Sequence, residues 1–278
     1  GSGARSIASS FQQRKKKVRQ NGLWGFVAGR CTEHTRHASC HHHFRHEKAL
    51  YRRRLPRQGA AGASAAVSRR GFYNARMFVH LRLHTEFSVV DGTNRIDEVA
   101  KAAAKDGQPA LAITDLNNLF GAIKFYKEAR GKGVKPILGA EIFLEGEAGA
   151  PPSRLIVLVQ SRQGYLNLSE LLARAWTRNV VKNLALSTWA WLEELSEGLI
   201  ALSGAQAGPV GQALMKGDES GAADIALRLA GIFPHRFYVE LQRAGRTDDE
   251  AHVVAAAQLA ARLSLPVVAT HPIQFAGP

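Results

Sequence analysis

The chain has 278 residues, a formal net charge of +14 and two cysteines, Cys31 and Cys40. This length allows one domain of ordinary or large size plus additional segments. No run of about 18 apolar residues is present and no apolar core of a secretory signal precedes the domain, so we expect a soluble, cytoplasmic protein without a membrane partner. The position of both cysteines before residue 77 leaves no possible disulfide in the rest of the chain, which fits a reducing compartment.

The positive charge is concentrated in residues 1–76, which hold 17 of the 37 basic side chains and only 2 of the 23 acidic ones. Residues 77–278 therefore have a net charge of −1. The first segment shows no sustained apolar period, so we expect it to be disordered, and we interpret it as non-native upstream or leader sequence. Two alternatives stay open. One is a polybasic arm that contacts nucleic-acid phosphates. The other is a zinc site, although its candidate ligands lack paired spacing; they are Cys31, Cys40, His41, His42, His43 and His46.

Residues 77–278 are predicted to form one domain in which short apolar strands alternate with longer helices. The predicted strands are Phe78–His84, Pro109–Thr114, Lys135–Leu144, Leu155–Gln160, Leu199–Leu202, Phe237–Gln242 and Pro266–Thr270. The predicted helices are Ile96–Lys105 with Asn94 as N-cap, Phe120–Arg130, Tyr165–Arg178, Trp189–Leu195 and Asp249–Leu263.

Strands separated by single helices imply crossover connections and a mainly parallel sheet. About seven such units favour an α/β fold of the distorted (β/α)7-barrel type. Functional side chains then belong at the carboxyl ends of the strands, where the strand-to-helix loops converge.

Polar side chains do follow several predicted strands. Alternation along the first strand places His80, Arg82 and His84 on one face, opposite Leu81 and Leu83. Taken singly, a strand-end Asp is more often a turn or cap residue, and a strand His is more often a partly buried ring than a ligand. Together they resemble the nitrogen and oxygen ligand set of a hydrolytic metal site. The remaining candidates are Asp91, Asp115, Glu141, Arg154 and His271.

Several longer motifs occur in an order that resembles the PHP (polymerase and histidinol phosphatase) domain of bacterial DNA polymerase III alpha subunits. The resemblance covers about 200 residues and implies the PHP fold. The motifs are Phe78–Ser88 with Asp91 and Gly92, Ala110–Asp115 with Asn118–Gly121, Gly133–Glu141, Gln163–Leu168, Phe237–Gln242 and Leu265–Thr270.

The resemblance also implies that several metal ligands of the family are missing here. His84, Asp91 and Glu141 match ligand positions. The other ligand positions are occupied by Arg82, Leu116, Arg154, Pro272 and Gln274, which replace His or Asp. Leucine, proline and arginine cannot donate to a cation, so we expect no multi-metal site and no cofactor in this part of the protein. We expect Arg82 and Arg154 to pair instead with Asp91, Asp115 or Glu141 in a vestigial cleft. One weakly held metal on His84, Asp91 and Glu141 is the alternative.

By resemblance, the chain is the N-terminal part of a replicative DNA-directed DNA polymerase, a nucleotidyltransferase that uses Mg²⁺ and acts in DNA replication. The catalytic carboxylates of such a polymerase lie beyond residue 278, so no catalytic residue is expected here. The implied partners are subunits of the polymerase III holoenzyme, in particular the proofreading exonuclease subunit, and DNA through the intact subunit. The alternative function is a metal-dependent phosphoesterase of the same superfamily.

Overall fold

The structure is a computed structural model that describes residues 78–146 and 150–275. The predictions for residues 1–76, including the polybasic arm and the zinc site, lie outside the described residues. Within the described part of the chain, no helix is both long enough and apolar enough to cross a membrane.

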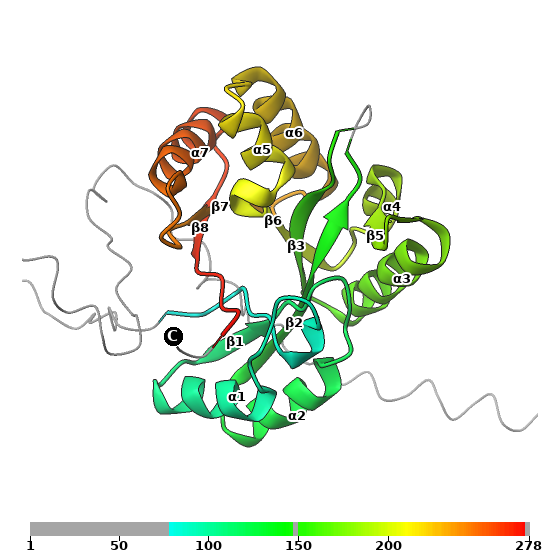
Figure 1. Ribbon diagram of the computed structural model, residues 1–278, viewed down its shortest axis with the longest axis vertical. Coiled ribbons are helices and arrows are strands. Elements are labelled where there is room, and N and C mark those ends of the chain that lie inside the picture. Colours follow the sequence, from blue (N-terminus) through cyan, green and yellow to red (C-terminus); the bar gives the residue numbers. More distant parts are fainter. Residues whose placement is uncertain (1–77, 147–149, 276–278) are drawn as a thin grey trace, which may run out of the picture.

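The described residues form an α/β fold, as predicted (Figure 1). The strands are β1 (Ala110–Ile113), β2 (Lys135–Leu144), β3 (Ser153–Val159), β4 (Val180–Val181), β5 (Leu184–Ser187), β6 (Leu199–Leu202), β7 (Phe237–Gln242) and β8 (Val267–Thr270). The helices are α1 (Ile96–Lys105), α2 (Ala122–Gly131), α3 (Arg162–Arg178), α4 (Trp189–Glu194), α5 (Pro209–Met215), α6 (Glu219–Ile232) and α7 (Asp249–Leu263), with short 3-10 turns η1 (Glu86–Ser88) and η3 (Ala205–Ala207).

Among these residues, eight strands make one sheet in the order β4-β5-β2-β3-β6-β7-β8, and β1 pairs with β2. The sheet is mixed. Four of the seven strand pairings among the described residues are parallel, and the three antiparallel ones involve β3 or β4. Strand β3 runs antiparallel to both β2 and β6. The reason is the short link of residues 145–152 between β2 and β3, which allows a hairpin and leaves no room for a helical crossover.

Residues Phe78–His84, predicted as a regular strand, instead make isolated bridges on two sides. The backbone N–H of Ala112 in β1 donates to His80 O at 2.9 Å, and His84 N–H donates to Ile273 O at 2.9 Å. The segment therefore lies between β1 and the residues that follow β8, where the red end of the ribbon approaches β1 in Figure 1. It links two edges of the sheet without forming a continuous ladder.

The side chains of this segment do not keep the predicted alternation. Leu81 packs with Ile156 and Leu202 of the sheet, whereas Leu83 packs with Ile96 and Phe125 of α1 and α2. The two leucines therefore do not share a face, and the phase of the segment changes between Leu81 and Arg82.

Helix α1 shows why the predicted helices formed close to their predicted bounds. Its buried residues Ile96, Ala100 and Ala103 are spaced by three and four and face the sheet. The predicted N-cap was wrong, because Arg95 occupies that position and the Asn94 amide donates to His84 O at 2.9 Å instead. Helices α5 and α6 were not predicted. Their sequences hold Pro209, which suits the first helical position, and glycines that weaken the helical pattern.

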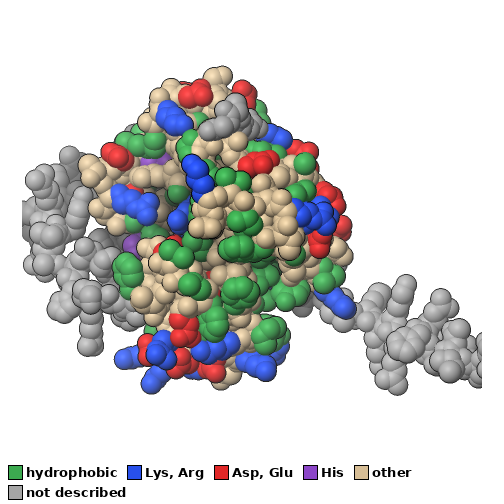
Figure 2. Space-filling view, turned by 45° about the vertical axis from the view of Figure 1, so that its right-hand side comes forward, with side chains coloured by type: hydrophobic (Ala, Val, Ile, Leu, Met, Phe, Trp, Pro, Cys, Tyr) green, Lys and Arg blue, Asp and Glu red, His purple; other side chains and the backbone are tan. Residues whose placement is uncertain are grey.

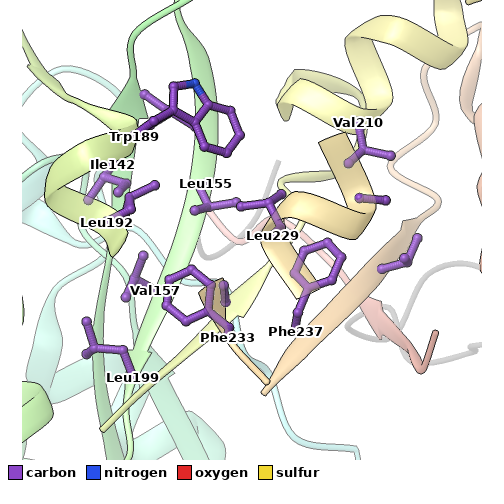
Figure 3. Close-up of a cluster of buried hydrophobic side chains, with 14 of the residues drawn as sticks. Ile142, Leu155, Val157, Trp189, Leu192, Leu199, Val210, Leu229, Phe233 and Phe237 are labelled. Carbon is purple, nitrogen blue, oxygen red and sulfur yellow. The ribbon is translucent and has the colours of Figure 1, made fainter. Parts of the chain in front are cut away.

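The largest hydrophobic cluster lies between the sheet and helices α3 to α7 (Figure 3). Ile142 and Leu155 come from the neighbouring strands β2 and β3, and Phe233 and Phe237 come from the end of α6 and the start of β7. All four side chains are almost completely buried. This core fixes the relative positions of β2, β3 and β7, the strands that supply the polar cluster described next.

Candidate functional site

A buried cluster of charged side chains occupies the region where Arg82 and His84 meet the sheet. Glu141 of β2 is at its centre and is fully buried. Its Oε1 accepts from Nη2 of Arg82 at 2.7 Å and from Nη1 of Arg154 at 3.3 Å. Its Oε2 lies 2.8 Å from Nε2 of His84. Burial alone would raise the pKa of Glu141, but the charge of Arg82 and the hydrogen bond to His84 outweigh it and lower the pKa to about 2.

The imidazole of His84 lies between two carboxylates. Its Nδ1 is 2.8 Å from Oδ1 of Asp91, and its Nε2 faces Glu141. Burial opposes a charged ring, yet the hydrogen bonds with Asp91 and Glu141 raise the pKa of His84 to about 9. Both ring nitrogens are then protonated near neutral pH and donate to the carboxylates. The Ser88 hydroxyl also donates to Asp91 Oδ1, at 2.8 Å, so the loop that follows η1 is tied to the ring.

Arg154 completes this group from β3. Its Nη1 lies 3.6 Å from Asp91 Oδ2 as well as 3.3 Å from Glu141 Oε1, and its guanidinium lies over the ring of Phe143. The predicted pairing of Arg82 and Arg154 with carboxylates of the cleft is therefore present, with Glu141 as the shared acceptor.

Glu240 of β7 is a member of the cluster that sequence reasoning missed. It is fully buried, and its Oε1 accepts from the Thr270 hydroxyl and lies 3.5 Å from Nη1 of Arg82. Burial raises the pKa of Glu240, although the charge of Arg82 acts in the opposite direction. The glutamate was the available signal, because it is the one charged side chain in the strand motif Phe237–Gln242 and a buried charge needs a partner.

Asp115 lies beside this cluster, but its carboxylate binds Thr85. It accepts from the N–H and the hydroxyl of Thr85 at 2.6 and 2.9 Å. Burial raises the pKa of Asp115, and the bonds from Thr85 oppose that change. Leu116, the next residue, donates its N–H to Ser88 Oγ at 2.9 Å. Asp115 and Leu116 therefore fix the loop around His84, and neither of them forms an ion pair with the charged side chains around Glu141.

The predicted grouping of His80 with Arg82 and His84 was wrong. Burial and the nearby His271 lower the pKa of His80 to about 4, and its other electrostatic neighbour is Asp106 at the end of α1. Its Nδ1 has no hydrogen-bond partner among the described residues. The phase change after Leu81 explains this separation, since it turns His80 away from the side that carries Arg82.

Comparison with known proteins identifies the family of this arrangement. A family model described as the PHP domain matches residues 80–244. The chain belongs to the PHP domain family. DNA polymerase III subunit alpha of Pseudomonas aeruginosa is 47% identical to this PHP domain over 199 residues, and the match covers 71% of the chain and 17% of that protein. The subunit of the same name from Escherichia coli K12 is 41% identical, with the same coverage.

The chain thus spans about 17% of the length of these curated relatives. Among solved structures, a protein from Bifidobacterium adolescentis assigned as a metal-dependent phosphoesterase aligns with a TM-score of 0.49 and 14% identity, covering 72% of this chain and 88% of that one.

The donor groups of this PHP domain do not fit the hydrolytic metal site that the family resemblance implies. Both nitrogens of His84 point at carboxylates, and Oε1 of Glu141 faces two guanidinium groups. Within residues 78–146 and 150–275, no group of three His, Cys, Asp or Glu side chains is arranged to hold a metal ion. Arg82 and Arg154 supply positive charge to the carboxylates of this cluster, Arg82 to Glu141 and Arg154 to Glu141 and Asp91.

Proposed function

We propose that this PHP domain is the N-terminal part of a replicative DNA polymerase III alpha subunit and acts there as a structural and docking domain without metal-dependent catalysis. The sequence comparison supports this proposal, because the chain is 41–47% identical to alpha subunits over 199 residues. The intact subunit would carry out Mg²⁺-dependent DNA synthesis in the cytoplasm, with DNA bound by its other regions.

The non-catalytic part of the proposal rests on one structural observation. The carboxylate of Glu141 is already hydrogen-bonded to Arg82 and His84. A hydrolytic metal needs carboxylate and imidazole lone pairs that converge on one point. Here the carboxylate lone pairs receive guanidinium and imidazolium protons, and the charges largely neutralise one another within the cluster. Charge-assisted hydrogen bonds of this kind hold side chains in fixed positions. The cluster therefore favours a fixed scaffold over a phosphoesterase site.

The phosphoesterase alternative is tested with the purified 278-residue chain. Hydrolysis of p-nitrophenyl phosphate would be measured with Mn²⁺ or Zn²⁺ added, for the native chain and for His84→Ala. We expect no metal-dependent hydrolysis above the metal-only rate in either protein. Saturable hydrolysis that requires the metal and disappears in His84→Ala would overturn the non-catalytic proposal.

The polymerase assignment and its partners have a separate test. We propose that the domain contributes to binding other subunits of the polymerase III holoenzyme, in particular the proofreading exonuclease subunit. The downstream reading frame should encode a polymerase region, and the encoded longer protein should synthesise DNA on a primed template with Mg²⁺. Co-elution of that longer protein with purified exonuclease subunit in size-exclusion chromatography is the expected partner result. A downstream frame without a polymerase region contradicts the assignment.

A further inference from the structure

A surface pocket lies where α2 ends and the strands β1 and β2 begin. Its volume is about 410 Å³, which falls within the range of small-molecule sites in proteins. We call it the Tyr126 pocket. Its walls combine one aromatic ring, two basic side chains and three apolar residues, namely Tyr126, Arg130, Lys135, Pro109, Val134 and Pro136.

The side chain of Tyr126 gives the pocket a flat aromatic wall. This residue is 41% exposed, and its hydroxyl oxygen accepts from Nη1 of Arg130 at 2.8 Å, one helical turn later. The guanidinium carbon of Arg130 lies 5.6 Å from the centre of the ring. The hydrogen bond therefore holds an aromatic surface and a cation side by side.

The pocket also carries two positive charges that no carboxylate neutralises. Among the residues that the structure describes, neither Arg130 nor Lys135 forms an ion pair. Glu128, the one acidic residue of α2, pairs with Lys132 instead. Both cations therefore keep their charge available for an anionic ligand.

A larger hollow, of about 540 Å³ between α4 and α6, lacks this excess of charge. Its walls hold two glutamates as well as two arginines, and Arg228 pairs with Glu193 at 3.2 Å. Nη1 of Arg236 donates to the backbone oxygens of Ser196 and Leu199 at 2.7 and 2.6 Å. The cations of that hollow are thus engaged within the protein, and those of the Tyr126 pocket are not.

The carboxyl end of α2 borders the pocket, and its backbone carbonyls would oppose an anion if they were free. They are capped. The oxygen of Ala129 accepts from the N–H groups of Lys132 and Val134 at 3.1 and 2.9 Å, and the oxygen of Arg130 accepts from Gly133 N–H at 3.1 Å. Gly133 has a φ of 76°, the left-handed conformation that allows this cap. The charge of Arg130 offsets the negative helix end further.

We propose that the Tyr126 pocket binds a nucleotide, with the base stacked on Tyr126 and the phosphate held by Arg130 and Lys135. An aromatic wall beside two free cations matches a ligand that joins a planar base to an anion. Figure 2 shows Lys and Arg side chains intermixed with Asp and Glu at the lower end of the molecule, where α1 and α2 lie, which does not favour a broad contact with a DNA duplex. The inference is independent of the proposed function.

The test measures binding to the purified 278-residue chain by ligand-observed NMR titration. The probes are deoxyadenosine monophosphate, deoxyadenosine and inorganic phosphate. We expect the monophosphate to bind with a Kd below about 1 mM. The other two probes should bind at least roughly tenfold more weakly, since each lacks one half of the contact.

Variants locate this binding in the pocket. Arg130→Gln should weaken binding of the monophosphate roughly tenfold and Tyr126→Leu roughly fivefold, whereas Tyr126→Phe, which keeps the ring, should retain it. Arg246→Gln is the matched control, because it removes the same charge from an exposed position before α7 and should leave the Kd unchanged. Residues 1–76 are present in every protein compared, so their basic side chains contribute equally. Circular dichroism checks that each variant is folded.

A 5′-phosphorylated deoxyadenosine hexamer distinguishes the two sources of such a ligand. Tighter binding of the hexamer that Arg130→Gln weakens assigns the pocket to the end of a single strand, and equal binding assigns it to a free nucleotide. Equal Kd values for the native chain, Arg130→Gln and Tyr126→Leu overturn the proposal, as does the absence of saturable binding up to about 5 mM. Inorganic phosphate that binds as tightly as the monophosphate also overturns it, because the ring would then contribute nothing.

Discussion

Nη2 of Arg82 and Oε1 of Glu141 lie 2.7 Å apart, and both side chains are almost completely removed from solvent. The same guanidinium reaches Glu240 on β7, so one arginine connects two carboxylates from separate strands. This relationship makes the cluster sensitive to the loss of Arg82, because the carboxyl groups of Glu141 and Glu240 would stay fully buried without it.

Arg82→Ala should destabilise the domain by about 3–5 kcal/mol, since it leaves the buried carboxylates without their shared partner. The free energy of unfolding would be measured by urea titration followed by circular dichroism. Arg262→Ala is the matched control, because Arg262 pairs with Glu219 on the surface. We expect that control to change stability by less than about 0.5 kcal/mol. Equal effects of the two substitutions would contradict the role given to Arg82.

Glu141→Gln and Glu240→Gln should lower the stability of the domain by very different amounts, although both residues are buried glutamates. The pKa of Glu141 is lowered to about 2, so its charge stabilises the fold, and a neutral amide loses roughly 3 kcal/mol of that interaction. The pKa of Glu240 is raised by burial, so its neutral form is the more compatible one. We expect Glu240→Gln to cost no more than about 1 kcal/mol. Thermal unfolding at pH 7 checks this prediction. The melting temperature of Glu141→Gln should be lower than that of Glu240→Gln.

Stability should fall on the alkaline side because of His84. Its folded-state pKa of about 9 lies above the ordinary value of 6.5. The stabilisation from the charged ring is therefore complete below about pH 6.5 and is lost as the pH rises through 9. Urea midpoints at pH 6, 7.5 and 9.5 would be compared with those of His84→Gln. The native chain should lose more stability over this range than the variant, and parallel curves would count against a charged His84.

Gly164→Ala should be strongly destabilising, whereas Gly231→Ala should not. A Cβ at Gly164 in α3 would lie 1.9 Å from the carbonyl oxygen of Gly198, so helix and turn would have to separate. A Cβ at Gly231 in α6 meets no heavy atom within 4 Å, and alanine there gains helix propensity of roughly 0.5–1 kcal/mol. Melting temperatures of the two variants should move in opposite directions. A similar shift for both would show that the close approach at Gly198 is not limiting.

Much of the fold was predictable because its elements are locally encoded. The bounds of β2, β6, β7, α1 and α7 agree with the predicted ones, since the periodic spacing of apolar residues acts within each segment. The resemblance to PHP domains also predicted that Arg82 pairs with a carboxylate, with Asp91, Asp115 and Glu141 as candidates, and the structure shows that this partner is Glu141, 59 residues away in the sequence.

The remaining features depend on contacts between distant parts of the chain. Glu240 joins the cluster through Arg82, 158 residues earlier in the sequence, so no local pattern places it there. His80 was misplaced because the first segment was treated as a regular strand, whereas its hydrogen bonds go to β1 on one side and to Ile273 on the other. The direction of β3 followed from the short link that precedes it, a feature that strand patterns alone do not reveal.

The position of residues 80–84 between β1 and Ile273 also bears on how the domain forms during protein synthesis. These residues leave the ribosome early, but one side of their hydrogen bonding requires a partner about 190 positions later. At synthesis rates of about 5–20 residues per second, the interval is roughly 10–40 s. Arg82, His84, Asp91, Glu141 and Arg154 have all been synthesised well before then, so most members of the charge cluster are available early. The contacts of this segment with Glu240 and Ile273 come later, and they complete the domain.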